Sequence, residues 1–211
     1  TGGIVCFNNF DLYNRAKLLR GWGRSSATFN ESENINKRFN IKVSGIDYDA
    51  KYVFSEAGYN FLPSEISAAF ALVQLKKLKN NIAIRNKNFD YLKKYFKQYN
   101  HLFDLPEQYP GVITPWLAFP LVLKKNKYFI RKKLQIYLEK NNIQTRTIFT
   151  GNILKQPIMK FKKFKKINNA EAVSNNVMEN GILIGCHQDL KMKDLKFITR
   201  TFDKFLKRFF I

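Results

Sequence analysis

The sequence predicts a globular α/β protein. Apolar residues recur at helical spacing in several segments, and short apolar or alternating runs lie between them, which is the pattern of helices alternating with strands. Hydrophobic residues make up 45% of the 211 residues and aromatic residues 15%, so the chain has enough apolar side chains for a real core. A chain of this length is one large domain or one and a half.

The first predicted domain, residues 1–105, begins with a short strand at residues 4–7 and a helix at residues 10–20. Gly21 lies just beyond the apolar pattern of that helix and is the expected end of it. Residues 21–57 then read as one long connection, without a helical or alternating pattern. A connection of that length inside a compact domain is more often functional than idle.

The chain is organised around residues 58–78, which contain Gly-Tyr-Asn, a turn at Pro63 and the start of a helix. Ser64 is the expected N-cap of this helix, and Glu65 would lie in its positive first turn. Apolar residues continue at helical spacing, so residues 64–99 should form one long helix or two nearly continuous ones. A stripe of this kind is ordinarily the buried face of a helix.

The second predicted domain covers residues 106–211 and begins where Pro106 and Pro110 interrupt the pattern. Strands and helices alternate through it, which predicts a small α/β domain. The expected strands are residues 115–123, 143–149 and 182–186, the expected helices are residues 127–140, 169–179 and 191–209, and residues 161–166 read as a solvated basic loop.

The chain carries a formal net charge of +21, which raises the question of a nucleic-acid partner. The excess belongs to the later part, because residues 1–75 have 8 basic and 7 acidic residues whereas residues 76–211 have 29 and 9. Of the basic residues 28 are Lys and 9 are Arg, although bidentate recognition of phosphates and base edges favours Arg. A basic nucleic-acid-binding module therefore stays a minor alternative, and no nucleic-acid partner is expected.

Sequence patterns alone reveal no active site. There is no Walker loop, Ser-His-Asp set or zinc signature, and the isolated Cys6 and Cys186 indicate neither a metal site nor a disulfide framework. His101 lies in a polar turn, and His187 follows an apolar strand, where it is either a structural or a catalytic histidine. With no apolar run of membrane-spanning length and no signal peptide, a cytoplasmic protein without a membrane partner is expected.

Four motifs occur in order along the chain: TGGIVCFNN, LLRGWGR, KRF and GYNFLPSEISAAFALVQLKKL. Together they resemble the second half of the DegT/DnrJ/StrS sugar aminotransferase family, fold type I enzymes that use pyridoxal phosphate to remodel nucleotide-linked sugars. The resemblance covers essentially the whole chain. It implies the C-terminal part of the large domain, with its long connecting helix, followed by a small C-terminal α/β domain.

The resemblance also implies that the full-length form is an enzyme and that this chain alone is inactive. Family members carry the Schiff-base lysine, or the histidine that replaces it in one branch, together with the aspartate that pairs with the cofactor's pyridine nitrogen, in their first half. Because the chain starts with Thr1 and not Met, we expect it to begin inside a longer protein or after processing. No catalytic residue is assigned within it.

One branch of the family is closer than the others. RGWGR, KRF, IQTRTIFTGNILKQP and GILIGCHQDL are similar to the 3-dehydratases that act on nucleotide-linked 4-keto-6-deoxyhexoses for surface polysaccharide, such as the O-antigen of lipopolysaccharide. One dehydratase subgroup holds an iron–sulfur cluster through cysteines after the Trp-Gly-Arg and before the Lys-Arg-Phe. Residues 25–28 and 35–36 contain no cysteine, which implies a cluster-free dehydratase. An aminotransferase on the same scaffold stays the alternative.

The two alternatives differ at one residue outside this sequence. In a dehydratase a histidine would remove a proton from the aminated cofactor while the C3 hydroxyl leaves the sugar. In an aminotransferase a lysine would bind the cofactor and an amino acid would supply the nitrogen. Both imply pyridoxal 5'-phosphate or pyridoxamine 5'-phosphate as cofactor, a nucleotide-sugar substrate, and a homodimer with shared active sites.

The resemblance assigns the cofactor contact to Asn60, the asparagine of Gly-Tyr-Asn. In family members this residue reaches across the dimer to the phosphate of the partner's cofactor, where a neutral amide can donate a hydrogen bond. Without the resemblance, Asn60 would read as a turn-forming residue before Pro63.

Five further residues are candidates for substrate binding. Arg24 and Arg146 suit the pyrophosphate of the sugar nucleotide, because a guanidinium fork matches phosphate oxygens; the alternative is that they are ordinary surface or salt-bridging arginines. Asn152, Gln156 and His187 are expected to line the sugar side.

Overall fold

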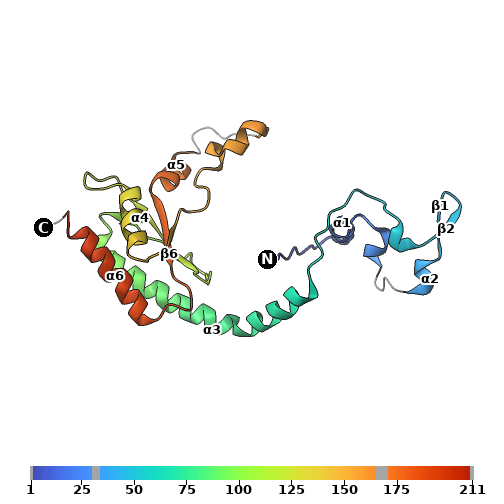
Figure 1. Ribbon diagram of the computed structural model, residues 1–211, viewed down its shortest axis with the longest axis horizontal. Coiled ribbons are helices and arrows are strands. Elements are labelled where there is room, and N and C mark those ends of the chain that lie inside the picture. The colour runs from blue at the N-terminus through green and yellow to red at the C-terminus, as the bar shows by residue number, and fades with distance from the viewer. Residues whose placement is uncertain (1, 30–33, 165–170, 210–211) are drawn as a thin grey trace. The chain divides into compact units, whose positions relative to one another are not determined.

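The computed structural model describes residues 2–29, 34–164 and 171–209 and divides into two compact units, Thr1–Leu75 and Lys76–Ile211 (Figure 1). The domain boundary predicted between residues 105 and 106 stays a prediction. In the described ranges every helix is too short or too polar to span a bilayer.

Unit 1 begins with helix α1, Phe10–Arg20, at the residues predicted for it. The side chain of Asn9 caps its start by accepting a hydrogen bond from the Leu12 amide at 2.9 Å, and Gly21 is its C-cap. The strand predicted at residues 4–7 is wrong: these residues pair with no strand in the described part of the chain, and Ile4 is 92% exposed. A strand needs a neighbouring strand for its backbone hydrogen bonds, whatever its local propensity.

The connection predicted at residues 21–57 contains more structure than its sequence indicated. A short hairpin turns at Ser44 and Gly45, both with positive φ, as tight hairpin turns require. The Nε of Arg38 donates to both carboxylate oxygens of Asp49, each at 2.9 Å. This charged hydrogen bond lowers the pKa of Asp49. The elements are η1 Ser25–Thr28, α2 Ile35–Arg38, β1 Ile41–Val43, β2 Ile46–Tyr48 and η2 Ala50–Tyr52.

Helix α3 runs without a break from Glu65 to Phe96 and is followed by the 3₁₀ turn η3, Lys97–Tyr99, which confirms a single long helix after Ser64. Its two halves differ in burial. The later half buries an apolar stripe, whereas the earlier half exposes one: Ile66 is 84% and Phe70 67% exposed. The expected burial of that earlier stripe is not found within the described residues.

Unit 2 contains a four-stranded antiparallel sheet in the order β3-β4-β6-β5. Strands β4, Ala118–Leu123, and β6, Gly181–Gly185, agree with the predicted strands, while β3, Phe103–Asp104, was not predicted. The strand predicted at residues 143–149 is reduced to β5, Thr145–Arg146, because only these two residues pair with β6; beyond them Phe149 adopts a positive φ of 45°.

Three predicted helices of unit 2 are present: α4 Arg131–Lys140, α5 Glu171–Asn180 and α6 Met192–Leu206. Helices α4 and α6 are shorter than predicted, whereas α5 ends one residue later than predicted and residues 169–170 of its prediction lie outside the described residues. Two 3₁₀ turns, η4 Ile153–Lys155 and η5 Pro157–Phe161, precede the predicted basic loop, of which residues 162–164 are irregular and residues 165–166 lie outside the described residues.

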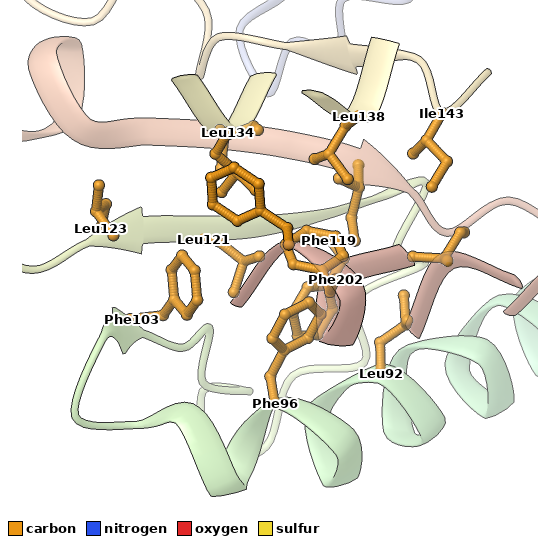
Figure 2. Packing of buried hydrophobic residues seen from close by; sticks show 14 of the residues in the cluster. Leu92, Phe96, Phe103, Phe119, Leu121, Leu123, Leu134, Leu138, Ile143 and Phe202 are labelled. Atoms are coloured by element: carbon orange, nitrogen blue, oxygen red, sulfur yellow. The ribbon is translucent and has the colours of Figure 1, made fainter. Parts of the chain in front are cut away.

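The core of unit 2 lies between the sheet and helices α3, α4 and α6 (Figure 2). Phe119, Leu121 and Leu123 alternate along β4 and are at most 3% exposed, as expected for a strand with one buried face. The ring of Phe96 on α3 lies 5.6 Å from the ring of Phe119 and 4.9 Å from that of Phe202 on α6. These apolar contacts fix the sheet against the later half of α3.

A polar contact also joins α6 to α3, which lie side by side in Figure 1. Asp203 accepts hydrogen bonds from the hydroxyls of Tyr95 and Tyr99, at 2.6 and 2.7 Å between oxygens. Burial, reinforced by this carboxylate, raises the pKa of Tyr95 and raises that of Tyr99 to about 12. Both hydroxyls therefore stay protonated donors across the neutral range.

The two cysteines provide a direct test of this fold. Cys6 is exposed, whereas Cys186 is fully buried and burial raises its pKa to about 12. At pH 8 a thiol with a pKa of 12 is about one part in 10⁴ thiolate, so we expect iodoacetamide to modify Cys6 rapidly and Cys186 only after unfolding. Mass spectrometry of the labelled peptides with and without urea checks this; rapid labelling of Cys186 without urea would contradict the packing of unit 2.

Candidate functional site

The segment that carries Asn60 is fastened to the end of α1 by backbone hydrogen bonds. The Tyr59 amide donates to Leu19 O at 2.6 Å and the Phe61 amide to Arg20 O at 3.0 Å. The Trp22 amide donates in return to Tyr59 O at 2.8 Å. Asn60 is thus held by both neighbours while its own side chain is exposed, with no side-chain hydrogen bond recorded in the described part.

Arg24 lies on the adjoining segment and is held by aromatic rings. Its guanidinium carbon is 4.5 Å from the ring centre of Trp22, 5.6 Å from that of Phe54 and 5.9 Å from that of Tyr52. Its Nε is buried and, among the described residues, finds no hydrogen-bond acceptor. A buried guanidinium nitrogen without an acceptor is costly, so this atom is suited to an anion that is not part of the protein.

A cavity of about 390 Å³ lies beside these two segments. Lys17, Arg20, Arg24 and Lys51 contribute four basic side chains to its lining, and none of the other lining residues within the described ranges carries a carboxylate. Trp22, Phe29 and Leu62 add apolar surface. The charge and the mixed lining fit a phosphate-bearing ligand with a flat or apolar part.

Arg146, in unit 2, lines an open groove of about 480 Å³ between α4 and β5, together with Lys132, Lys140 and Glu139. Its Nη1 donates to Thr145 O at 2.9 Å. Glu139 accepts from the amide and the hydroxyl of Thr145, at 2.6 and 2.7 Å, and these bonds lower the pKa of Glu139. The groove thus combines basic side chains with one carboxylate already engaged by the sheet.

Asn152 is only 3% exposed, and its side chain is occupied within the protein. Its Nδ2 donates to Glu171 at 3.1 Å and to Asn175 at 2.8 Å, while its Oδ1 accepts from the Leu154 amide. Gln156 is half-buried and donates to Thr150 O at 3.1 Å. In this structure Asn152 ties η4 to α5, so any effect on a sugar would act through neighbouring residues.

His187 follows β6 at the start of a turn that ends at Leu190. Its Nδ1 lies 3.7 Å from a carboxylate oxygen of Asp189, and its side chain is 39% exposed. Two residues of α3 that were not predicted from the sequence contact this turn, Asn88 through backbone carbonyls and Arg85 through Gln188. Asn88 lies about one helical turn before Leu92 and two before Phe96, and therefore on the same buried face. A polar residue on this apolar stripe was the sequence feature that could have identified Asn88.

The structure therefore groups the candidates in two sets. Asn60 and Arg24 share the paired segments of unit 1, and Arg146, Asn152, Gln156 and His187 belong to unit 2. No hydrogen bond or ion pair recorded in the described ranges joins those four directly to one another. Nor do these ranges bring three or more His, Cys, Asp or Glu side chains together as a metal site.

Comparison with known proteins identifies relatives along the whole chain. The family described as the DegT/DnrJ/EryC1/StrS aminotransferase family matches residues 1–203. The lipopolysaccharide biosynthesis protein RfbH of Salmonella typhimurium is 28% identical over 207 residues, which are 97% of this chain and 47% of the relative. The GDP-4-keto-6-deoxy-D-mannose 3-dehydratase of Escherichia coli O55:H7 is 31% identical over 194 residues, 89% of this chain and 46% of the enzyme.

A solved structure agrees with these relatives. The E. coli GDP-4-keto-6-deoxy-D-mannose-3-dehydratase with bound hydrated PLP matches with a TM-score of 0.76 and 27% identity, covering 92% of this chain and 48% of that one. The mixed α/β fold predicted from the sequence is confirmed by this match. The chain spans about half the length of the relatives it matches.

Proposed function

This chain belongs to the DegT/DnrJ/EryC1/StrS aminotransferase family, and from that membership we propose that it is part of a 3-dehydratase acting on a nucleotide-linked 4-keto-6-deoxyhexose. The product would serve surface polysaccharide synthesis in the cytoplasm. The observation that carries the proposal is the basic cavity lined by Arg24 and, from the segment that carries Asn60, by Leu62; this cavity has the charge and the lining for a phosphate-bearing ligand. The similarity to a GDP-4-keto-6-deoxy-D-mannose 3-dehydratase favours dehydration over the other reactions of the family.

Pyridoxal 5'-phosphate or pyridoxamine 5'-phosphate is the proposed cofactor, and when bound it supplies an electron sink for chemistry next to the sugar carbonyl. Asn60 would hold its phosphate by donating from the side-chain amide. The residues present fit that group: the amide is exposed, its backbone is fixed on both sides, and the described residues that line the neighbouring cavity contribute four basic side chains. The side chain therefore needs no rearrangement before it binds.

We propose a homodimer, in which Asn60 contacts the cofactor of the partner subunit. The exposed apolar stripe on the first half of α3, which includes Ile66, Phe70 and Val73, supports this proposal. A stripe of this size on a soluble protein marks a surface that another protein segment covers. An isologous dimer would use the same surface on both copies and form two identical sites.

Arg24 would bind the pyrophosphate of the sugar nucleotide. The three aromatic rings fix its guanidinium, and its buried Nε would gain the acceptor that it lacks. Arg146 is the second candidate for the pyrophosphate, and on the sugar side we propose Gln156 and His187, with Asn152 holding η4 in place. The roles of these residues are to bind, to orient and to exclude water around the reacting carbon.

Replacing Arg24 by lysine is expected to raise KM for the sugar nucleotide about tenfold, and by glutamine about 100-fold, with smaller changes in kcat. Lysine keeps the charge but loses the planar fork, whereas glutamine loses both. The measurement is steady-state kinetics of the whole enzyme. Arg15→Gln is the matched control, because Arg15 is 62% exposed and forms a surface ion pair with Glu56 at 2.8 Å. An unchanged KM in Arg24→Gln would remove Arg24 from the substrate site.

The reaction itself is tested with the whole enzyme, the cofactor, L-glutamate and GDP-4-keto-6-deoxy-D-mannose. A 3-deoxy-4-keto sugar nucleotide, identified by mass spectrometry and NMR, is the expected product. A 4-amino sugar that keeps its C3 hydroxyl would instead establish an aminotransferase, the alternative that the family description favours. Absence of both products with GDP-, dTDP-, CDP- and UDP-linked 4-keto-6-deoxy sugars would refute the proposed function.

A further inference from the structure

The turn that presents His187 is held by one buried side chain of α3. The Leu190 amide donates to His187 O at 3.2 Å and closes the turn. The Nδ2 of Asn88 donates to His187 O at 2.9 Å and reaches Leu190 O at 3.4 Å. Asn88 is 5% exposed, so a single buried amide fixes both ends of the turn to the long helix.

A second set of contacts leads from α3 to the imidazole itself. Arg85, almost one helical turn before Asn88, donates from Nε to Gln188 Oε1 at 2.7 Å. The Nε2 of Gln188 donates to Asp189 Oδ2 at 3.2 Å, and that oxygen lies 3.7 Å from His187 Nδ1. Arg85 thus orients the amide of Gln188, the amide orients the carboxylate of Asp189, and the carboxylate faces one nitrogen of His187.

The opposite edge of the imidazole lies near bare backbone. A Cβ at Gly185 would be 3.5 Å from His187 Cδ2 and 3.6 Å from Nε2, so this ring edge packs close to the glycine. No hydrogen bond to Nε2 is recorded in the described part of the chain. One side of the ring is therefore oriented by protein groups, and the other side keeps a nitrogen available for a ligand.

Packing alone does not account for Asn88 at this position. It lies on the stripe of α3 that buries Phe89, Leu92 and Phe96, where an apolar residue would fill the space without desolvating an amide. Burying an amide is favourable only when its hydrogen bonds are made, and here both acceptors are carbonyls of the His187 turn. The choice of asparagine is thus tied to the geometry of this turn.

We infer that Asn88 and Arg85 are positioning residues for His187, which they hold with Nδ1 toward Asp189 and Nε2 on the ring edge beside Gly185. The role of His187 at the substrate rests on the proposed function, whereas the positioning of its ring does not. Asn88 fixes the position of the His187–Leu190 turn relative to α3. Arg85 acts through Gln188 and Asp189 and fixes the rotation of the imidazole.

The chain contains two histidines, His101 and His187, which makes NMR of ¹³C-labelled histidine a direct test. Asn88→Ala and Gln188→Ala are each expected to shift the ring signals of His187 and to leave those of His101 unchanged. Asn176→Ala and Gln98→Ala are the matched controls, because both residues are exposed and lie elsewhere. Gln188 lies at the surface end of the network, so its variant tests the network even if Asn88→Ala does not fold. If folded Gln188→Ala shows the same His187 signals as the unaltered chain, the positioning role of Arg85 is wrong. If folded Asn88→Ala shows the same His187 signals, the positioning role of Asn88 is wrong.

Kinetics of the whole enzyme then separate positioning from simple stability. Asn88→Ala and Gln188→Ala are expected to lower kcat/KM for the 4-keto sugar nucleotide roughly tenfold or more, because small displacements of a positioned group cost that much. Gln188→Glu keeps the acceptor for Arg85 but loses the amide that donates to Asp189, so it should not restore the activity lost in Gln188→Ala. If GDP-4-keto-6-deoxy-D-mannose leaves the His187 signals of the unaltered enzyme unchanged, the proposed role of His187 at the substrate fails. The positioning by Asn88 and Arg85 is still decided by the NMR of the variants.

Discussion

Replacing Gly58 by alanine is expected to separate the segment that carries Asn60 from the Trp22–Arg24 segment. A Cβ on Gly58 would lie 2.1 Å from the Gly23 nitrogen and 2.4 Å from the Trp22 carbonyl carbon. Both are backbone atoms, and they cannot move away as the tip of a side chain could. Gly23, on the facing segment, cannot become alanine either, since a Cβ on Gly23 would lie 1.8 Å from Glu56 O.

We expect Gly58→Ala to destabilise the packing of these segments by about 3 kcal/mol, the upper range for overpacking a closed contact. The Trp22, Tyr59 and Phe61 amides, which donate the hydrogen bonds between segments, should exchange with solvent much faster. Hydrogen exchange followed by mass spectrometry over residues 16–62 measures this. Gly3→Ala is the control, because nothing lies within 4 Å of its added Cβ.

The same variant links the fold to the proposed function. Because Asn60 and Arg24 owe their places to the two paired segments, Gly58→Ala should weaken both the binding of the cofactor and that of the sugar nucleotide in the whole enzyme. If the amides of Gly58→Ala exchange as slowly as those of the unaltered chain, the two segments accommodate the added Cβ without a loss of stability. The geometry assigned to Asn60 would then be incorrect.

The largest effect on stability is expected from Phe96→Ala, in the centre of unit 2. Phe96 is fully buried, and its ring lies 4.9 Å from Phe202, 5.6 Å from Phe119 and 5.9 Å from Phe103 (Figure 2). Truncation removes the contact that joins α3 to β3, β4 and α6 and leaves a cavity, which should cost roughly 3–5 kcal/mol of unfolding free energy.

Urea unfolding of Phe96→Ala, followed by labelling of the buried Cys186, measures this loss. The midpoint of the unfolding transition should fall to a lower urea concentration, while the dependence of the unfolding free energy on urea concentration stays the same. Phe161→Ala is the control, because Phe161 is 81% exposed and its removal should change stability by less than about 0.5 kcal/mol. Equal midpoints for the two variants would show that Phe96 is not central to the core.

Several elements could be predicted from the sequence because the interactions that form them are local. Helix α1 begins and ends at the predicted residues, since Asn9 caps it and Gly21 terminates it within one turn of the chain. The later half of α3 and strands β4 and β6 follow from apolar periodicity, which reports directly which side of an element will be buried. The cofactor role of Asn60 was predicted only through the resemblance of its motif to a known family, and it stays a prediction.

Contacts between residues far apart in the sequence were decided by the tertiary structure. The strand predicted at residues 4–7 is absent because strand propensity is not sufficient without a neighbour to pair with. Arg24 meets Tyr52 and Phe54, Gly23 meets Gly58, and Asn88 meets the His187 turn, and each contact spans tens of residues. Local patterns carry no information about such encounters, so a positive charge, a glycine or a buried amide acquires its role only when folding brings its partner within reach.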